Sequence, residues 1–149
     1  TIENLLQRAD NIVAVGTTSV RTLESLAALA WRILREGSPA TERVVGQWEL
    51  YDIPQEFSGR EVLQTIAEYM RKNGVEQLKA ATQIMITPLG YRFRVVRYII
   101  TNFHQPKSTL LLLVGAYVGD DWHRIYDYAL AHDFRFLSYG DSSLLKVAR

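Results

Sequence analysis

The sequence predicts an α/β fold, a layered α/β/α arrangement around a mostly parallel, mixed central sheet with one hairpin. Three observations support this prediction. Residues 11–16 (NIVAVG) form a short β-branched run ending on glycine, as in strands buried on both faces. Residues 20–36 then place apolar side chains at helical spacing. Strand and helix patterns go on alternating along the chain, as in sheets covered by helices.

The first long helix has clear signals at both ends. Three hydroxyl residues at 17–19 are good N-cap candidates, and Gly37 and Pro39 end the apolar periodicity. The residues before 11 resemble the end of another helix. Since the chain also begins without methionine, we expect a fragment or a processed chain.

The segment 41–79 has elements of its own. Residues 43–53 (RVVGQWELYDI) are typical of a strand, and Ser58 with Glu61 has the spacing of a capping box. The helix that follows runs to about residue 73, where Gly74 is suited to a left-handed cap. We interpret residues 1–149 as one α/β domain and 41–79 as a possible insertion within it.

The second half of the chain repeats the alternation. Residues 82–86 and 92–100 are predicted strands around a turn at 88–90, and we expect them to pair as the hairpin. Ser108 or Thr109 caps a helix that Gly119 ends, and Asp120 and Asp121 begin another. A short last strand is expected at 134–137, before a polar turn and an apolar tail.

Composition excludes several classes of protein. The 149 residues carry a net charge of +1, so no strongly basic nucleic-acid binder is indicated, and 48% hydrophobic content allows one stable core. The absence of cysteine excludes disulfides, thiol nucleophiles and cysteine-ligated metals in this chain. The longest apolar run, 110–118, is about half the ~20 residues that cross a bilayer. We expect a cytoplasmic protein.

Three predicted strands end in polar turns, GTTS, TNFHQPKST and SYGDS. Such turns gather at the carboxyl edge of a parallel sheet, where ligands bind. Free backbone N–H groups at helix starts suit a carboxylate, a phosphate or a ribose. Nearby hydroxyls come from Thr17, Thr18, Ser19, Ser108 and Thr109. The GTTS run is neither a P-loop nor a dinucleotide fingerprint, and plain helix capping explains it equally well.

The second turn is the richest in functional side chains. His104 is a candidate general base or acid, and Lys107 a candidate for neutralising an anion. The alternative is a hydrogen-bonded loop histidine and a solvated lysine. The candidates in this turn are Asn102, His104, Lys107, Ser108 and Thr109.

The third turn adds Tyr139 and Asp141. An aspartate there is a helix cap, a turn former, or a carboxylate for ribose hydroxyls or a proton. His123 and His132 are nine residues apart and poorly aligned for a shared metal, so no metal site is predicted.

The same turns carry a resemblance to a known family. Residues 15–25 read VGTTSVRTLES, residues 100–114 read ITNFHQPKSTLLLLV, and residues 134–141 read FRFLSYGD. All three occur, in this order, in S-adenosylmethionine:tRNA ribosyltransferase-isomerases. With 84–96, the resemblance covers roughly half of the chain.

The resemblance implies an activity and a set of site residues. The ribosyl part of S-adenosylmethionine, a cosubstrate rather than a bound cofactor, is transferred to 7-aminomethyl-7-deazaguanine in tRNA and isomerised. Epoxyqueuosine forms, and adenine and methionine leave. Implied partners are tRNA and the rest of a longer polypeptide that includes a β-rich domain. The implied catalytic residues are His104, Lys107 and Asp141, and the implied substrate-binding residues are Thr17, Thr18, Ser19, Arg21, Asn102, Ser108, Thr109 and Tyr139.

Two other functions remain open. A non-catalytic α/β module that binds tRNA or a nucleotide would use the same turns without chemistry. An ordinary methyltransferase should have a glycine-rich loop after its first strand, whereas GTTS has one glycine.

Overall fold

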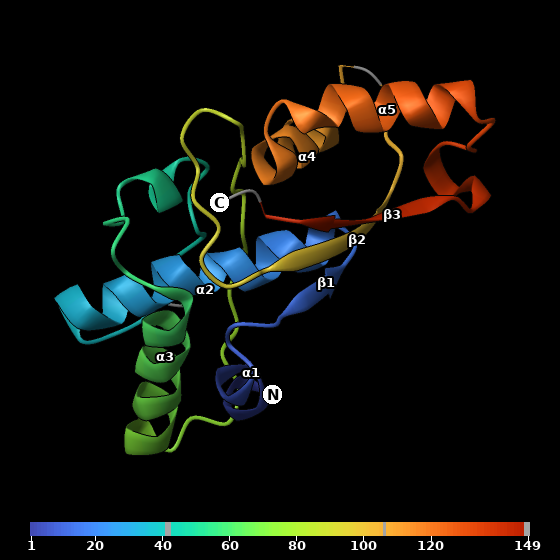
Figure 1. Cartoon of the computed structure of the whole chain (residues 1–149). Helices are drawn as coiled ribbons and strands as arrows, with labels where there is room; N and C mark the ends of the chain where they lie inside the picture. Colours follow the sequence, from blue (N-terminus) through green and yellow to red (C-terminus); the bar gives the residue numbers. More distant parts are fainter. Residues whose placement is uncertain (41–42, 106, 148–149) are drawn as a thin grey trace.

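The computed structural model of the chain describes residues 1–40, 43–105 and 107–147. The predicted α/β fold with a mixed sheet is confirmed (Figure 1). No helix within these ranges is both long enough and apolar enough to cross a membrane. The elements in chain order are α1 (Ile2–Gln7), β1 (Val13–Val15), α2 (Thr17–Glu36), the 3-10 helix η1 (Glu49–Tyr51), α3 (Gly59–Asn73), β2 (Tyr98–Asn102), α4 (Thr109–Val118), α5 (Asp121–Ala131), the 3-10 helix η2 (Leu137–Tyr139) and β3 (Ser142–Lys146).

The described sheet has three strands in the order β1-β2-β3. β1 runs parallel to β2, with Val15 opposite Ile100, and β3 runs antiparallel to β2, with Ser142 opposite Asn102. The carboxyl ends of β1 and β2 and the start of β3 therefore lie at one edge, called here the carboxyl edge. The opposite, amino edge carries Tyr98 opposite Lys146.

Helices cover only one face of this sheet in the described residues. Ala14, Ile99 and Leu145 share a face because they are partners in the register, and all three are buried against α2 and α4. Figure 1 shows β1 and β2 lying in front of α2. The other face carries exposed apolar side chains, including Val15 (67% exposed) and Leu144 (66%). The second helical layer of the predicted α/β/α arrangement is absent from the described residues.

Several helix ends follow their sequence signals. Gly37 and Gly74 end α2 and α3 in the left-handed conformation, with φ of 74° and 62°. Ser58 and Glu61 form the predicted capping box of α3. Ser108 caps α4, since its side chain accepts a hydrogen bond from the Leu110 N–H. Local rules thus place most helix boundaries.

The predicted hairpin is wrong. Residues 82–86 do not pair with 92–100; instead the N–H groups of Gln83 and Met85 donate to the carbonyls of Val45 and Gln47. An isolated parallel bridge joins Val45 to Thr82. The backbone partners of this segment come from the 43–53 stretch, and a local turn signal cannot reveal that choice.

Two further predicted strands are reduced or absent. In 43–53, only the bridge at Val45 remains, followed by η1. Residues 134–137 form no strand, since Leu137 has a φ of 60°, whereas the apolar tail forms β3. α3 packs on α1 and α2. The interpretation of 41–79 as an insertion stays a prediction, and the first two residues of this segment lie outside the described ranges.

A buried carboxylate explains why β2 begins late. Glu24 of α2 is 0% exposed and accepts hydrogen bonds from the Tyr91 hydroxyl (2.7 Å) and the backbone N–H groups of residues 94–96 (2.8–3.0 Å). Burial raises the pKa of Glu24. The N–H groups of 94–96 are bound to this side chain and so are unavailable to a strand. At Gly59, a side chain would collide with the Arg94 carbonyl, so α3 also approaches this segment closely.

Candidate functional site at the carboxyl edge

The three polar turns meet at the carboxyl edge of the sheet. Gly16 donates its N–H to the Ile100 carbonyl (2.8 Å), which joins the first turn to β2. Leu137 donates to the Phe103 carbonyl (2.8 Å), and Asn102 lies opposite Ser142, which joins the third turn to the second. Neighbouring strands are about 5 Å apart, so the turns after β1 and before β3 lie roughly 10 Å from each other.

The first turn places its hydroxyl residues inside the helix. Gly16, with a φ of 84°, is the N-cap of α2, and no side chain caps this end. Thr17 and Thr18 are the first helical residues, and the Ser19 hydroxyl donates to the Val15 carbonyl (2.7 Å). The capping alternative is therefore wrong for these three residues. The N-terminus of α2 keeps N–H groups that can donate hydrogen bonds to a ligand anion.

Arg21 lies in the next turn of the same helix. Its side chain is half-buried, and its Nε is buried without a hydrogen-bond partner in the described part of the chain. A buried donor without a partner carries a desolvation cost. Arg21 is therefore a better candidate for ligand contact than its position in the helix suggested.

His104 lies at the carboxyl edge but turns inward. It is 8% exposed, its Nε2 lies 2.9 Å from the Thr101 hydroxyl, and its backbone N–H donates to the Tyr126 hydroxyl (3.0 Å). Burial lowers the pKa of His104, which favours the neutral imidazole at neutral pH. Neutral imidazole is the form that accepts a proton.

Three polar residues of the second turn, Lys107, Ser108 and Thr109, line a cavity of about 350 Å³. Lys107 is exposed with a φ of 65°, Ser108 is occupied in capping α4, and Thr109 is exposed. Pro88 and Trp122 form an apolar wall of this cavity. His104 is not among its lining residues, so the predicted pair of His104 and Lys107 is divided between an interior and a surface position.

The third turn is closed by an ion pair. Asp141 accepts hydrogen bonds from the backbone N–H of Arg135 (2.6 Å) and from its Nε (3.1 Å). This contact lowers the pKa of Asp141 and so keeps the carboxylate ionised. Tyr139 is 73% exposed and free to contact a ligand or a partner. Asp141 is thus placed to accept hydrogen bonds rather than to carry a proton at neutral pH.

A second cavity, of about 670 Å³, opens beside this edge. Phe103, Tyr128 and Phe134 give it aromatic walls, and Ser142 and Ser143 give it hydroxyls. Aromatic and hydroxyl groups together suit a nucleoside. Asn102, half-buried at the end of β2, immediately precedes this wall.

Thr101 and Tyr126 are the site residues that sequence reasoning missed. Thr101 is three residues before His104 and could have been found from its place on the strand. Tyr126 comes from α5, and no sequence signal connects it with His104. No cluster of three or more histidine, aspartate or glutamate side chains that could hold a metal occurs among residues 1–40, 43–105 and 107–147.

Comparisons with known proteins give the family. A family model described as "Queuosine biosynthesis protein" matches residues 1–145. An S-adenosylmethionine:tRNA ribosyltransferase-isomerase from Cereibacter sphaeroides is 49% identical over 88 residues, which are 58% of this chain and 25% of that protein. Its counterpart from Brucella ovis is 37% identical over 141 residues, which are 94% of this chain and 27% of that protein.

A solved structure supports the same assignment. The crystal structure of S-adenosylmethionine tRNA ribosyltransferase from Thermotoga maritima matches with a TM-score of 0.55 and 29% identity, over 96% of this chain and 35% of that one. The chain spans about a quarter of the length of the curated relatives that it matches. Because the family model extends over nearly all of its residues, the chain belongs to the family of queuosine biosynthesis proteins.

Proposed function

We propose that this chain forms part of an S-adenosylmethionine:tRNA ribosyltransferase-isomerase. The reaction transfers and isomerises the ribosyl group of S-adenosylmethionine onto 7-aminomethyl-7-deazaguanine in tRNA. Epoxyqueuosine is the product, and adenine and methionine are released. The observation that carries the proposal is the meeting of three polar turns at one sheet edge in a chain of this family.

The chemistry requires a base and anion-binding groups. The sulfonium of S-adenosylmethionine acidifies the attached ribose carbon, so a base must remove a proton there. We assign this role to His104, because its lowered pKa keeps the imidazole neutral. The free N–H groups of Thr17, Thr18 and Ser19, with Arg21, would hold the cosubstrate carboxylate or a tRNA phosphate.

The other candidates complete the pocket. Lys107 would neutralise an anion from the cavity beside α4, with Ser108 and Thr109 next to it. Asn102 and Tyr139 would contact the ribose or the base. Asp141 would accept hydrogen bonds from ribose hydroxyls.

The rest of a longer polypeptide is the third partner, beside tRNA and S-adenosylmethionine. The relatives are about four times the length that this chain matches, and the open sheet face exposes Val13, Val15, Ile100 and Leu144. Apolar side chains on a sheet face normally pack on another layer. We therefore place the remaining polypeptide, including a β-rich domain, against this face. Because tRNA is the substrate, we place the reaction in the cytoplasm.

Product analysis tests the activity. The chain is incubated with S-adenosylmethionine and tRNA bearing the deazaguanine precursor, alone and with the remaining polypeptide of the Brucella ovis relative. Released adenine and the mass of the modified nucleoside are then measured. Release of adenine with formation of epoxyqueuosine supports the proposal, whereas formation of S-adenosylhomocysteine would indicate methyl transfer and contradict it.

The role of His104 has its own test. His104→Ala should lower single-turnover ribosyl transfer by ~100-fold or more, because general-base catalysis contributes about that much. His123→Ala, which removes an exposed histidine of α5, is the matched control and should leave the rate near normal. Near-normal transfer by His104→Ala would exclude His104 as the base.

A non-catalytic module that binds tRNA or a nucleotide is the second candidate. His104 is 8% exposed and its Nε2 already lies 2.9 Å from the Thr101 hydroxyl, so the proposed base is not freely presented to a substrate. Salt-dependent tRNA binding without adenine release, in the chain alone and in the reconstituted form, would favour this function.

A further inference from the structure

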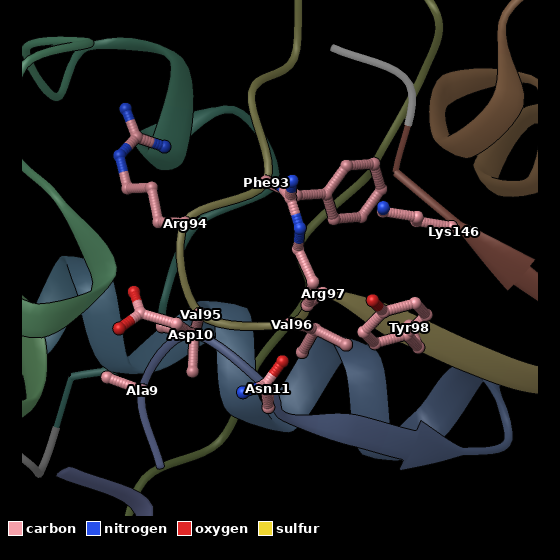
Figure 2. Close-up of a pocket in the computed structure, with 10 residues that line it drawn as sticks. All are labelled: Ala9, Asp10, Asn11, Phe93, Arg94, Val95, Val96, Arg97, Tyr98 and Lys146. Atoms are coloured by element: carbon pink, nitrogen blue, oxygen red, sulfur yellow. The ribbon is translucent and has the colours of Figure 1, made fainter. Parts of the chain in front are cut away.

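A polar cavity opens at the amino edge of the sheet, on the side away from the three turns. Its volume is about 380 Å³. Arg97 directly precedes β2 and Lys146 ends β3, and both line the cavity together with Asn11, which lies just before β1. Figure 2 shows these side chains around one opening beside the Phe93 ring. Elements far apart in the sequence thus contribute to one pocket.

The cavity is positively charged. Arg94, Arg97 and Lys146 line it against a single carboxylate, Asp10, although the whole chain has a net charge of only +1. Asp10 is neutralised by Arg60, 2.7 Å away. An anion entering the cavity therefore meets a surplus of positive charge.

Two of the three cations have no acidic partner. Within the described ranges, neither Arg97 nor Lys146 takes part in an ion pair. The Arg94 guanidinium is turned away in Figure 2 and donates to the Ile53 carbonyl (2.8 Å), so it adds charge without reaching into the opening. Arg97 and Lys146 are the groups available to a ligand.

The backbone around the cavity keeps these two cations close together. Val147 donates its N–H to the Arg97 carbonyl (3.2 Å), and Lys146 lies opposite Tyr98 in the sheet. The Lys146 Nζ lies 5.9 Å from the centre of the Tyr98 ring. A cation over an aromatic ring is held without being neutralised.

We propose that this cavity binds a phosphate group of an RNA backbone, with Arg97 and Lys146 as its two cationic contacts. Arginine and lysine are the usual partners of backbone phosphates. The half-buried Phe93 and Tyr98 rings beside the cations offer surfaces for the adjoining nucleoside. The choice of tRNA as the RNA rests on the proposed function.

Salt-dependent binding of unmodified tRNA to the whole chain tests the inference. Fluorescence anisotropy is measured from about 50 to 200 mM salt for the wild type and for the double variant Arg97→Gln/Lys146→Gln. The slope of log affinity against log salt falls by about 0.9 for each phosphate that is no longer neutralised. Because Arg97 and Lys146 share one phosphate, the double variant should lose about 1 in slope and roughly tenfold in affinity at the lowest salt.

A matched variant controls for general charge. Arg35→Gln/Lys72→Gln removes two exposed cations from the last turns of α2 and α3, outside the cavity. It should keep the wild-type slope. Equal slopes for the two double variants, or no measurable tRNA binding by the wild-type chain, would overturn the inference.

Inorganic phosphate distinguishes an RNA backbone from a free anion. Replacing chloride by ~10 mM phosphate at constant ionic strength should weaken tRNA binding less than about twofold, because many contacts share the RNA. Inorganic phosphate binding that the double variant alone loses, with a tRNA salt slope that the double variant leaves unchanged, would assign the cavity to free phosphate and overturn RNA as its occupant. The binding assay needs neither S-adenosylmethionine nor turnover. If the double variant keeps the wild-type salt slope while the wild type still transfers the ribosyl group, this inference is refuted and the proposed function stands.

Discussion

Two carboxylates each hold a loop of this protein, one in the interior and one at the surface. Glu24 is 0% exposed and binds the N–H groups of residues 94–96 before β2. Asp141 binds Arg135 across the turn before β3, where the Arg135 side chain is 67% exposed. Burial raises the pKa of Glu24, whereas the arginine contact lowers the pKa of Asp141.

The difference in burial gives the two carboxylates different roles, because Glu24 stabilises the fold whereas Asp141 can contact a ligand. Three donors around Glu24, the Tyr91 hydroxyl and the N–H groups of Val95 and Val96, are buried, so losing this carboxylate leaves them without hydrogen bonds. The donors of Arg135 can turn to solvent when Asp141 is lost. The interior carboxylate therefore governs stability, and the surface carboxylate is the one that a ligand can use.

Removing the interior carboxylate should have the largest effect. Glu24→Ala leaves three backbone N–H groups and the Tyr91 hydroxyl without their acceptor. We expect a loss of about 3–5 kcal/mol in the free energy of unfolding, measured by urea denaturation at pH 7.

An exposed glutamate of the same helix is the control. Glu36→Ala removes the partner of Arg43, where both side chains are about half exposed, and should change the free energy of unfolding by less than about 1 kcal/mol. Equal losses for the two variants would remove the distinction between interior and surface carboxylates.

Local sequence signals predicted the helices of this fold better than the strands. Ser58, Glu61 and Gly74 act on neighbouring backbone, so their effect is readable from spacing. The hairpin failed because the partner of residues 82–86 comes from about 40 residues earlier in the chain. Glu24 shortens β2 by accepting a hydrogen bond from the Arg94 N–H, 70 residues later in the chain. A glutamate within a helical pattern carries no sequence signal that predicts such a contact.

The candidate site was predictable in position but not in orientation. The polar turns after β1 and β2 indicate the carboxyl edge, as the strand-end rule predicts. The third turn follows no strand and reaches this edge because antiparallel β3 begins there. Whether His104 faces solvent or Thr101 depends on packing against α5, which sequence spacing does not encode. The amino-edge cavity was missed because Arg97 and Lys146 are separated along the chain and lie in no polar turn.

The pH dependence of stability should have opposite signs for the two carboxylates. Because the folded pKa of Glu24 lies above its ordinary value of 4.5, its contribution is fully present below about pH 4.5 and falls as the pH rises toward the folded pKa. Glutamine resembles a protonated carboxyl but does not titrate. The stability difference, wild type minus Glu24→Gln, should therefore shrink above pH 4.5 in urea melts from pH 3 to 8.

The surface carboxylate gives the reverse trend. The folded pKa of Asp141 lies below its ordinary value of 3.8, so its contribution is present above that pH and is lost as the pH falls through the folded pKa. The difference between the wild type and Asp141→Asn should vanish at the acid end. Trends of the same sign for both residues would contradict their assigned environments.

Asp141→Asn at pH 7 should have the smallest effect on stability. Asparagine keeps one oxygen that can accept from the Arg135 N–H, and the exposed guanidinium can bind water. The midpoint of thermal unfolding should shift by less than about 2 °C. Asp121→Asn, which alters the exposed pair with Arg124, is the control and should behave alike. If Asp141→Asn destabilised the protein as much as Glu24→Ala does, the third turn would be part of the folding core despite its exposure.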